Sequence, residues 1–254
     1  MNGEPPATIV IPCHDEEGRL DDDALLGLVD APGGPRLLFV DDGSADGTLA
    51  RLQALAAQRP GRIDVLPLPT NRGKAEAVRA GLLAALADPA SVPIVGYLDA
   101  DLATPPAEVR RLLEVLRQRP GVDVLISSRV SLLGRDIHRS PARHYLGRVF
   151  ASLASLVLTM TVYDTQCGAK LFRRTAALER ALGEPFLSRW IFDVELLGRL
   201  TAGPAGLPLE RILEEPLLSW RDVPGSKLRG RQMAGAALDL TRVARDLRRR
   251  RHAG

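Results

Sequence analysis

The sequence predicts an α/β protein whose first half forms an open, mostly parallel sheet. In the first hundred residues, four short apolar runs alternate with helix-like stretches of ten to fifteen residues. Strands that alternate with helices of this length favour βαβ units, and continuously apolar strands indicate a sheet that helices cover on both faces. The expected strands are Ala7–Pro12, Arg36–Val40, Ile63–Leu68 and Val92–Leu98, and the expected helices are Asp21–Asp30, Thr48–Arg59 and Lys74–Ala87.

The second half is less regular and is expected to share one structure with the first. No internal repeat and no linker rich in Gly, Pro or Ser separates the two. We therefore predict a single domain over residues 1–254, with one half at about 7–105, a second at about 106–228 and a basic C-terminal helix or tail at about 229–254. The expected elements are a helix at Pro106–Arg119, a strand at Val122–Ser127, a basic loop at Arg129–Arg143, an apolar helix ending near Tyr163, a strand at Ala169–Arg173, a helix at Ile191–Ala202, a proline-punctuated stretch at Leu207–Trp220 and a helix at Gln232–Arg250.

Composition and charge exclude several classes of protein. With 45% hydrophobic and 26% charged residues in 254, the chain is neither disordered, collagen-like nor disulfide-dense. The net charge of +3 is unevenly spread, since ten Lys and Arg against three Asp and Glu follow from Arg221 onward and leave the body acidic. An aromatic content of only 4% provides no stacking platform for bases. We therefore expect no nucleic-acid partner.

The sequence predicts a cytoplasmic protein, either free or peripheral on the inner face of the cell membrane. Cys13 and Cys167 lack metal-ligand spacing and are expected to be reduced and partly buried. The N-terminus has no basic start and apolar run of the kind that marks a signal peptide. The longest uncharged run, Val149–Tyr163, would reach about 22 Å as a helix against a hydrocarbon core of about 30 Å. We predict no transmembrane helix, and expect this run to lie on a membrane or to be buried.

Polar clusters follow each of the four strands expected in the first half. Because ligands of open α/β sheets bind outside the carboxyl ends of the strands, these clusters are expected to meet in one crevice. They are Cys13-His14-Asp15-Glu16, Asp41-Asp42-Gly43-Ser44, Thr70-Asn71-Arg72-Gly73-Lys74 and Asp99-Ala100-Asp101.

The cluster Asp99-Ala100-Asp101 is typical of a divalent metal site. Two carboxylates at positions i and i+2 on a strand end suit Mg²⁺ or Mn²⁺ held partly by protein and partly by substrate phosphates. Alone, the pattern is weak and is more often a solvated turn or cap before a helix. The acids Asp41 and Asp42 at another strand end favour the metal hypothesis, since such acids accept hydrogen bonds from a base and a ribose.

The cluster Asn71-Arg72-Gly73-Lys74 places two cations at the start of an expected helix. The N–H groups of a helix N-terminus already favour anions, so this junction suits a diphosphate. The spacing of a Walker A loop is absent, and no Gly-x-Gly-x-x-Gly follows the first strand. Kinase-type P-loops and dinucleotide-binding folds are therefore disfavoured.

Together these motifs resemble the family 2 glycosyltransferases of the GT-A fold. That fold joins a Rossmann-like nucleotide-binding half, with a mostly parallel sheet, to a mixed acceptor-binding half. The second half resembles one branch in particular, the dolichyl-phosphate (polyprenyl-phosphate) β-glucosyltransferases. The stretches that carry this resemblance are Ile11-Pro12 with the acid pair after it, Val40 to Ser44, Asn71 to Lys74, Asp99 to Asp101, Asp164 to Gly168, Lys170 to Phe172, Arg189 to Leu197 and Gly225 to Leu228.

The resemblance implies an inverting, metal-dependent transfer of a hexose, with glucose favoured. The donor would be a nucleoside diphosphate sugar, with UDP-glucose favoured, and the acceptor a polyprenyl phosphate. The implied donor-binding residues are Pro12, His14, Glu16, Asp42, Arg72, Lys74, Asp99 and Ala100, with Asp99 and Asp101 on the Mg²⁺ or Mn²⁺ ion. The expected acceptor-binding residues are Arg129, Gln166, Trp190 and Lys227, and the expected catalytic residues are Asp101 and Asp193, the latter facing the acceptor where many relatives hold a base.

Two questions stay open at the level of sequence. Asp193 and Glu195 point about 200° apart on a helix, so at most one of them lines the crevice; Glu195 is then a surface residue or a salt-bridge partner of Arg189 or Arg199. A phosphate acceptor is already an anionic nucleophile and makes Asp193 less critical, whereas a hydroxyl acceptor must lose a proton. A soluble hydroxyl acceptor is the alternative function, kept open by Ala169 where the branch usually has an aromatic residue. A non-catalytic nucleotide-binding module would leave the metal acids unexplained.

Overall fold

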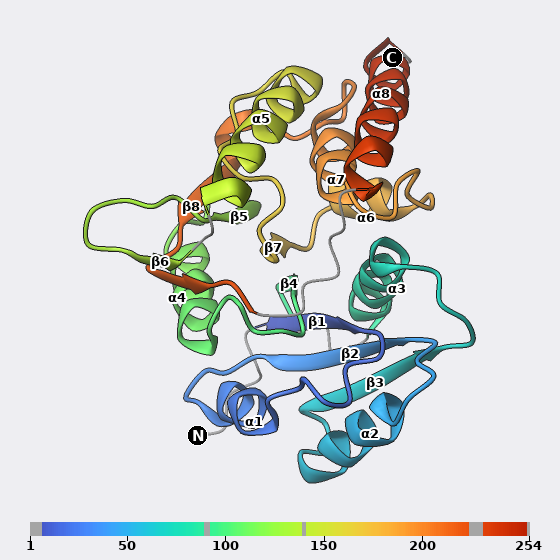
Figure 1. Cartoon of the computed structure of the whole chain (residues 1–254), viewed down its shortest axis with the longest axis vertical. Coiled ribbons are helices and arrows are strands. Elements are labelled where there is room, and N and C mark those ends of the chain that lie inside the picture. The colour runs from blue at the N-terminus through green and yellow to red at the C-terminus, as the bar shows by residue number, and fades with distance from the viewer. Residues whose placement is uncertain (1–6, 89–91, 139–140, 224–230, 253–254) are drawn as a thin grey trace.

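A mostly parallel sheet runs through the computed structural model, which describes residues 7–88, 92–138, 141–223 and 231–252. Within these residues, seven strands follow the spatial order β3-β2-β1-β4-β7-β5-β8. Neighbouring strands are parallel except at β7, which runs antiparallel to both β4 and β5 (Figure 1). Their bounds are β1 Ala7–Cys13, β2 Arg36–Asp42, β3 Ile63–Leu68, β4 Ile94–Leu98, β5 Val124–Ser128, β7 Ala169–Arg173 and β8 Ile212–Pro216.

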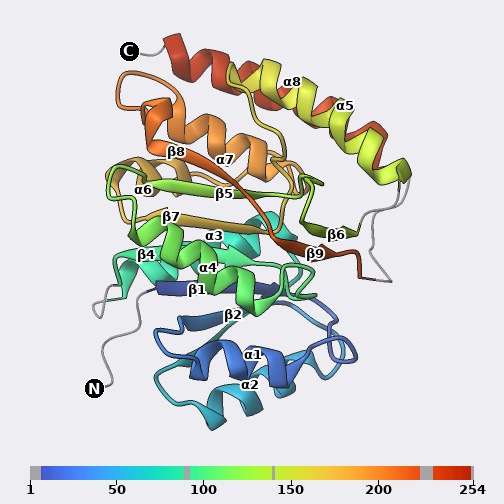
Figure 2. The same cartoon turned by 90° about the vertical axis from the view of Figure 1, so that its left-hand side faces the viewer.

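Helices cover both faces of this sheet, as the apolar strands predict. One hydrophobic core lies beneath α1, α2 and α4, and a second beneath α3, α6 and α7. Helices α5 and α8 lie side by side and pack on the second layer (Figures 1 and 2). The bounds are α1 Asp22–Asp30, α2 Thr48–Gln58, α3 Lys74–Ala87, α4 Pro106–Arg117, α5 Pro141–Leu158, α6 Ala176–Leu182, α7 Phe192–Thr201 and α8 Arg231–His252.

The predicted elements of the first half are observed within about two residues of their expected ends. Helix α1 begins one residue later than expected because Asp21 is its N-cap, whose carboxylate accepts a hydrogen bond from Ala24 N. Strand β2 continues to Asp42 because it stays paired with β3 as far as Leu68. These ends place the acidic cluster at the edge of the sheet.

The second half contains elements that the sequence pattern did not predict. Helix α6 is short, and its N-cap is Thr175, whose hydroxyl accepts a hydrogen bond from Leu178 N. Strand β6 (Asp136–His138) lies in the expected loop Arg129–Arg143 and pairs in parallel with β9 (Ser219–Arg221). The proline-punctuated stretch contains a short 3₁₀ helix, Leu209–Arg211, before β8. Each of these elements is too short to give a periodic signal.

The basic C-terminal segment is a helix packed into the domain, not a separate tail. Leu240, Val243 and Leu247 of α8 are buried in the second core. Arg251 donates to the carbonyls of Val157 and Leu158 and so caps the end of α5. The helix predicted at Gln232–Arg250 is therefore confirmed as α8, and the part of the segment that the structure describes packs into the domain.

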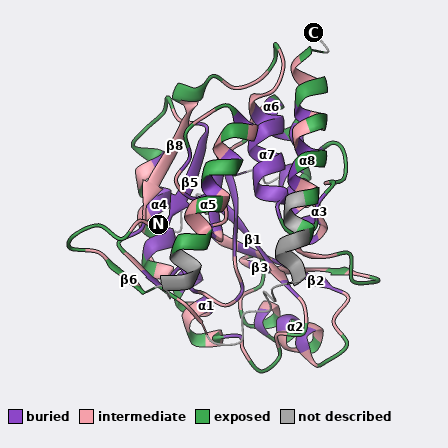
Figure 3. Cartoon of the chain, turned by 45° about the horizontal axis from the view of Figure 1, so that its top comes forward, coloured by how far each residue is buried: buried purple, intermediate pink, exposed green. Residues whose placement is uncertain are grey.

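Helix α5 is amphipathic and begins at Pro141, inside the expected loop. Ala151, Ala154 and Leu158 are buried, whereas Val149 and Leu156 face solvent. Figure 3 shows the contrast with α7, which is buried almost all round. One face of the helix is therefore buried, as one of the two alternatives predicts, and the other face is exposed. Contact of the exposed face with a membrane stays a prediction. Among the described residues, no helix is both long and apolar enough to cross a membrane.

Candidate active site

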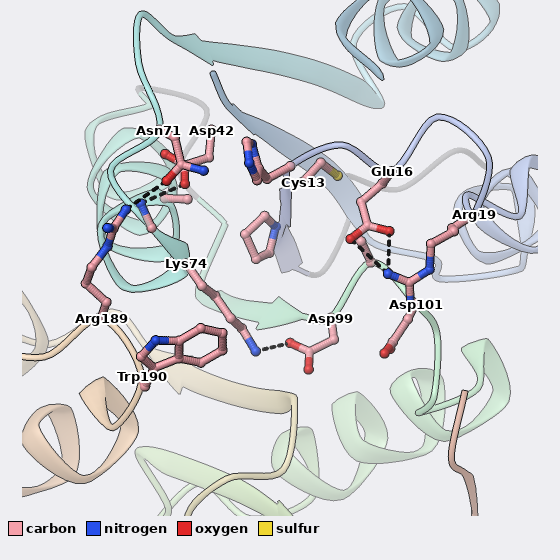
Figure 4. Close-up of a pocket in the computed structure, with 15 residues that line it drawn as sticks. Cys13, Glu16, Arg19, Asp42, Asn71, Lys74, Asp99, Asp101, Arg189 and Trp190 are labelled. Carbon is pink, nitrogen blue, oxygen red and sulfur yellow. Dashed lines mark hydrogen bonds and ion pairs between the residues drawn. The ribbon is translucent and has the colours of Figure 1, made fainter. Parts of the chain in front are cut away.

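A cavity of about 450 Å³ opens where the polar clusters of the first half meet. The ends of β1, β2 and β4 and the start of α3 form three of its sides, and the segment before α7 forms another (Figure 4). The crevice predicted from strand-end chemistry is therefore present. Its lining residues are Pro12, Cys13, His14, Glu16, Arg19, Asp42, Asn71, Gly73, Lys74, Ala77, Asp99, Ala100, Asp101, Arg189 and Trp190.

The aspartate pair after β4 is held against Gly168, the residue directly before strand β7. Asp99 N donates to the carbonyl of Gly168 at 2.9 Å. A Cβ at Gly168 would lie 2.2 Å from the Asp99 carboxylate, so the absence of a side chain there makes room for it. Asp101 accepts a hydrogen bond from Ala103 N at 3.1 Å. Burial and the nearby charge of Asp99 raise the pKa of Asp101.

Lys74 reaches across the cavity from the first turn of α3 to the aspartate pair. Its Nζ lies 2.5 Å from Asp99 Oδ1, the ion pair drawn in Figure 4. Burial disfavours the ammonium charge, but the carboxylates of Asp99, Asp193 and Asp101 outweigh it and raise the pKa of Lys74. The cavity therefore carries a cation and two acids side by side.

Asp42 lines the opposite wall and organises the loop before α3. Its carboxylate is buried and accepts hydrogen bonds from Arg72 N and Gly73 N, both at 2.7 Å. Gly73 has a φ of 92°, a left-handed conformation that favours glycine. Asp42 thus fixes the loop that begins α3 and carries Lys74 into the cavity.

The side chain of Arg72 lies outside this cavity, contrary to its expected place beside the nucleotide. It is 60% exposed, with its guanidinium 3.8 Å from Glu76, and it lines a neighbouring depression. The turn at Gly73 separates its direction from that of Lys74. Arg72 supports the site through its backbone, whose N–H donates to Asp42 and whose carbonyl accepts from Arg189.

The expected acceptor residues occupy different environments. The guanidinium of Arg129 donates two hydrogen bonds to Asp164, at 2.6 and 2.8 Å, and lies 5.3 Å from the centre of the Trp220 ring. Although burial disfavours its charge, Asp164 outweighs burial and raises the pKa of Arg129. Trp190 lines the cavity and is 41% exposed. Gln166 has a buried Nε2 that forms no hydrogen bond to the described residues. Lys227 lies outside the described residues.

Asp193 faces the core and not the cavity, which corrects its expected orientation toward the acceptor. Its carboxylate lies 2.6 Å from Lys170 Nζ and accepts a hydrogen bond from the hydroxyl of Tyr97. Antiparallel pairing places Lys170 directly opposite Tyr97, so both donors converge on Asp193. Glu195 pairs with Arg199 at 2.6 Å, and both are buried. The salt bridge to Arg199 is therefore confirmed, and the surface position of Glu195 is wrong.

Several cavity residues were not predicted from the sequence. Arg19 pairs with Glu16 at 3.0 Å. Arg189 donates to Asn71 Oδ1 at 2.8 Å and to the carbonyl of Arg72 at 3.1 Å, so it joins the segment before α7 to the loop before α3 (Figure 4). The sequence signal available for Arg189 was its place directly before Trp190, in the stretch Arg189 to Leu197 that carries the family resemblance. Lys170, which is buried and not part of the cavity lining, was signalled by a cation between apolar residues of the strand Ala169–Arg173.

The donor set suits a divalent cation that is shared with a substrate phosphate. Within the described ranges, no three His, Cys, Asp or Glu side chains are grouped as a complete metal site. Asp99 Oδ1 is buried, and its contact is the ion pair with Lys74, so this oxygen is available to a stronger cation. Mg²⁺ is commonly held by one or two carboxylates together with substrate phosphates. Asp99 and Asp101 fit that description.

Fold and site together define a glycosyltransferase of the GT-A fold. The chain belongs to glycosyl transferase family 2, which residues 8–180 match. The dolichyl-phosphate β-glucosyltransferases of Homo sapiens and Saccharomyces cerevisiae are 33% and 31% identical to it. These alignments cover 87% and 94% of this chain and 69% and 72% of the relatives. The resemblance inferred from the motifs and the enzyme class, a hexosyltransferase, are confirmed.

Solved structures confirm the predicted fold class. Glucosyl-3-phosphoglycerate synthase from Mycobacterium tuberculosis, in complex with Mn²⁺, UDP-glucose and phosphoglyceric acid, matches with a TM-score of 0.67 at 21% identity. The match covers 94% of this chain and 80% of that one. The same enzyme with Mn²⁺, UDP and its product matches with a TM-score of 0.65 at 22% identity. At this level of identity the comparison defines the fold alone.

Proposed function

We propose that this protein transfers glucose from UDP-glucose to a polyprenyl phosphate, with inversion at the anomeric carbon and with Mg²⁺ or Mn²⁺ bound. The observation that carries the proposal is the single cavity that brings Asp42, Lys74, Asp99 and Asp101 together. The relatives named above, at about 30% identity over most of the chain, support the choice of donor sugar and acceptor. The UDP complexes of the structural neighbours support the choice of nucleotide.

In this proposal the two sides of the cavity bind different parts of the donor. The wall with Asp42 and Asn71 takes the nucleoside, and Asp99 and Asp101 hold the cation beside the diphosphate. When bound, the cation neutralises negative charge that develops on the leaving diphosphate. Lys74, which pairs with Asp99 in the structure, would donate to the same phosphates when a cation takes its place on Asp99. Pre-oriented positive charge at a leaving group stabilises the transition state.

A phosphate acceptor removes the need for a general base. The second pKa of a phosphate monoester is about 6, so the acceptor is an anionic nucleophile at neutral pH. The position of Asp193 agrees with this chemistry, because its carboxylate is already bound by Lys170 and Tyr97. Trp190, on the cavity wall, offers an apolar surface to the sugar ring.

The outer face of α5 supports a lipid-bearing acceptor. Its exposed apolar residues recur at helical spacing and form one stripe, and α8 beside it presents exposed arginines. The first turns of α5 lie on the side of the molecule to which the parallel strands point (Figure 2). We propose that this surface contacts a membrane, each arginine adding about 1 kcal/mol on anionic lipid. The stripe is Tyr145, Val149, Leu153 and Leu156, and the arginines are Arg242, Arg245, Arg248 and Arg249.

The test is a donor and acceptor panel. The protein is incubated with Mn²⁺ or Mg²⁺ and UDP-glucose, UDP-galactose or GDP-mannose, with and without a short polyprenyl phosphate, and nucleoside diphosphate release is measured. We expect UDP release from UDP-glucose only with the lipid, and its loss in Asp101→Asn. Release with 3-phosphoglycerate or a simple alcohol, and none with the lipid, would replace the acceptor by a soluble hydroxyl compound. Release from no donor would refute the proposed function.

A further inference from the structure

We propose that Lys170 is a positioning residue that, paired with Asp193, holds the aspartate pair in the geometry that binds the cation. The inference rests on the proposed function and deepens it, since it names what sets the metal site without touching the metal. Asp193, where a base is expected, has a different role in this proposal, because its carboxylate anchors Lys170.

The pair is buried between strand β7 of the sheet and helix α7, which packs on one face of that sheet. Lys170 has no exposed surface, and Asp193 is 5% exposed. Lys170 Nζ donates to Asp193 Oδ1 at 2.6 Å and lies 5.3 Å from the centre of the Tyr97 ring. The hydroxyl of Tyr97 donates to the same oxygen of Asp193. The first turn of α7, where Asp193 lies, favours its negative charge. Both charges are therefore fixed in place.

Lys170 transmits this anchoring to Asp99 through a short segment of backbone. A second hydrogen bond runs from Lys170 Nζ to the carbonyl of Cys167, at 2.8 Å. The next residue, Gly168, accepts the backbone N–H of Asp99 and contacts its carboxylate. On the other side, Phe192 precedes Asp193 and lies 6.0 Å below Lys74 Nζ. Asp99 is thus held by Gly168, which follows the carbonyl that Lys170 binds. Lys74 lies over the ring of Phe192, which precedes Asp193.

A buried ion pair is weak evidence for stability, because desolvation of the two charges opposes their attraction. The surroundings of Lys170 are the aromatic core of Tyr97, Phe172 and Phe192, in which an apolar side chain of similar length would pack. Residues that orient metal ligands from behind, without touching the metal, commonly change metal affinity 10- to 100-fold when they are replaced. The contacts of Lys170 match that role.

The test compares Lys170→Met, Asp193→Asn and the double variant. The binding of Mn²⁺ in the presence of UDP is measured by the electron paramagnetic resonance signal of free Mn²⁺, and thermal unfolding is measured in parallel. Lys170→Met leaves an unpaired buried carboxylate and is expected to lose stability. The double variant removes both charges and regains stability, but we expect its Mn²⁺ affinity to stay about 10- to 100-fold below that of the unmodified protein.

Asp123→Asn is the matched control. Asp123 lies directly before β5 and is a buried acid paired with Arg211. Its replacement is therefore expected to lower stability and to leave Mn²⁺ affinity within about twofold. Recovery of Mn²⁺ affinity together with stability in the double variant would overturn the inference, as would a loss of turnover in Asp193→Asn at unchanged Mn²⁺ affinity. If the unmodified protein binds no Mn²⁺ with UDP, the proposed function itself fails.

Discussion

Replacing Gly168 by alanine is predicted to damage the site without unfolding the protein. The new Cβ would lie 2.2 Å from Asp99 Oδ2, whereas a comfortable carbon–oxygen contact is about 3.3 Å. The carboxylate must therefore move by about 1 Å. A displacement of that size at a reacting centre costs about 100-fold in rate. The carboxylate ends a partly exposed side chain, whose rotation relieves the clash at the cost of its ion pair with Lys74, so we expect a stability loss below about 1.5 kcal/mol.

The assay measures kcat/KM for the donor, the dissociation constant of Mn²⁺ with UDP, and urea unfolding. Gly121→Ala is the control, because a Cβ at Gly121 would meet no atom within 4 Å. We expect Gly168→Ala to lower kcat/KM by about 100-fold and to weaken Mn²⁺ binding, and the control to behave like the unmodified protein. A kcat/KM within about threefold of the unmodified value would show that Asp99 needs no fixed position, and would refute the reasoning.

Three further predictions follow from single side chains. Lys74→Ala should raise the KM for the nucleotide sugar at least tenfold and Arg72→Ala less than about threefold, since only Lys74 points into the cavity; equal effects in steady-state kinetics would contradict this. Leu156→Asp on the exposed face of α5 should weaken sedimentation with anionic vesicles by about tenfold at unchanged urea stability. Burial raises the pKa of Cys13 and Cys167, so less thiolate forms, and both should resist a thiol reagent at pH 8 until the chain is unfolded; rapid reaction of the native protein would count against this.

The sequence predicted the crevice because its chemistry follows from local order. In a parallel sheet every strand end of one direction reaches the same edge, so four polar clusters after four strands had to meet there. No knowledge of which strand neighbours which was needed. Asp42, Lys74, Asp99 and Asp101 lie together for that reason.

The roles of Asp193 and Lys170 could not be predicted in the same way. Residues Ala169–Arg173 were expected as a strand, but their periodicity does not say that the strand runs antiparallel between β4 and β5. That placement alone sets Lys170 opposite Tyr97 and within reach of Asp193. Helical spacing likewise shows that the side chains of Asp193 and Glu195 point in different directions, but it does not show that both side chains are buried. Long-range pairing, not local pattern, decides these side chains.

Arg72 and Lys74 illustrate how one backbone angle decides a side chain's role. Both are cations two residues apart beside a helix start, and sequence alone gave them the same task. The left-handed turn at Gly73 ends the loop, after which Lys74 opens α3 and points inward, while Arg72 turns toward Glu76.

The distribution of charge links the site to the proposed membrane surface. Arg250 pairs with Asp246 at 2.6 Å and also with Glu184, and Arg251 caps α5, so these two cations hold the fold and add little to the outer field. The exposed cations belong to α8, the helix that packs beside α5 with its apolar stripe, and basic and apolar residues together are typical of helices that rest on an anionic lipid surface. The acids of the cavity lie at the sheet edge instead. The acids of the cavity and the exposed cations of α8 thus occupy separate regions. One nearly neutral chain therefore suits both a metal cation in the cavity and an anionic lipid surface at α8.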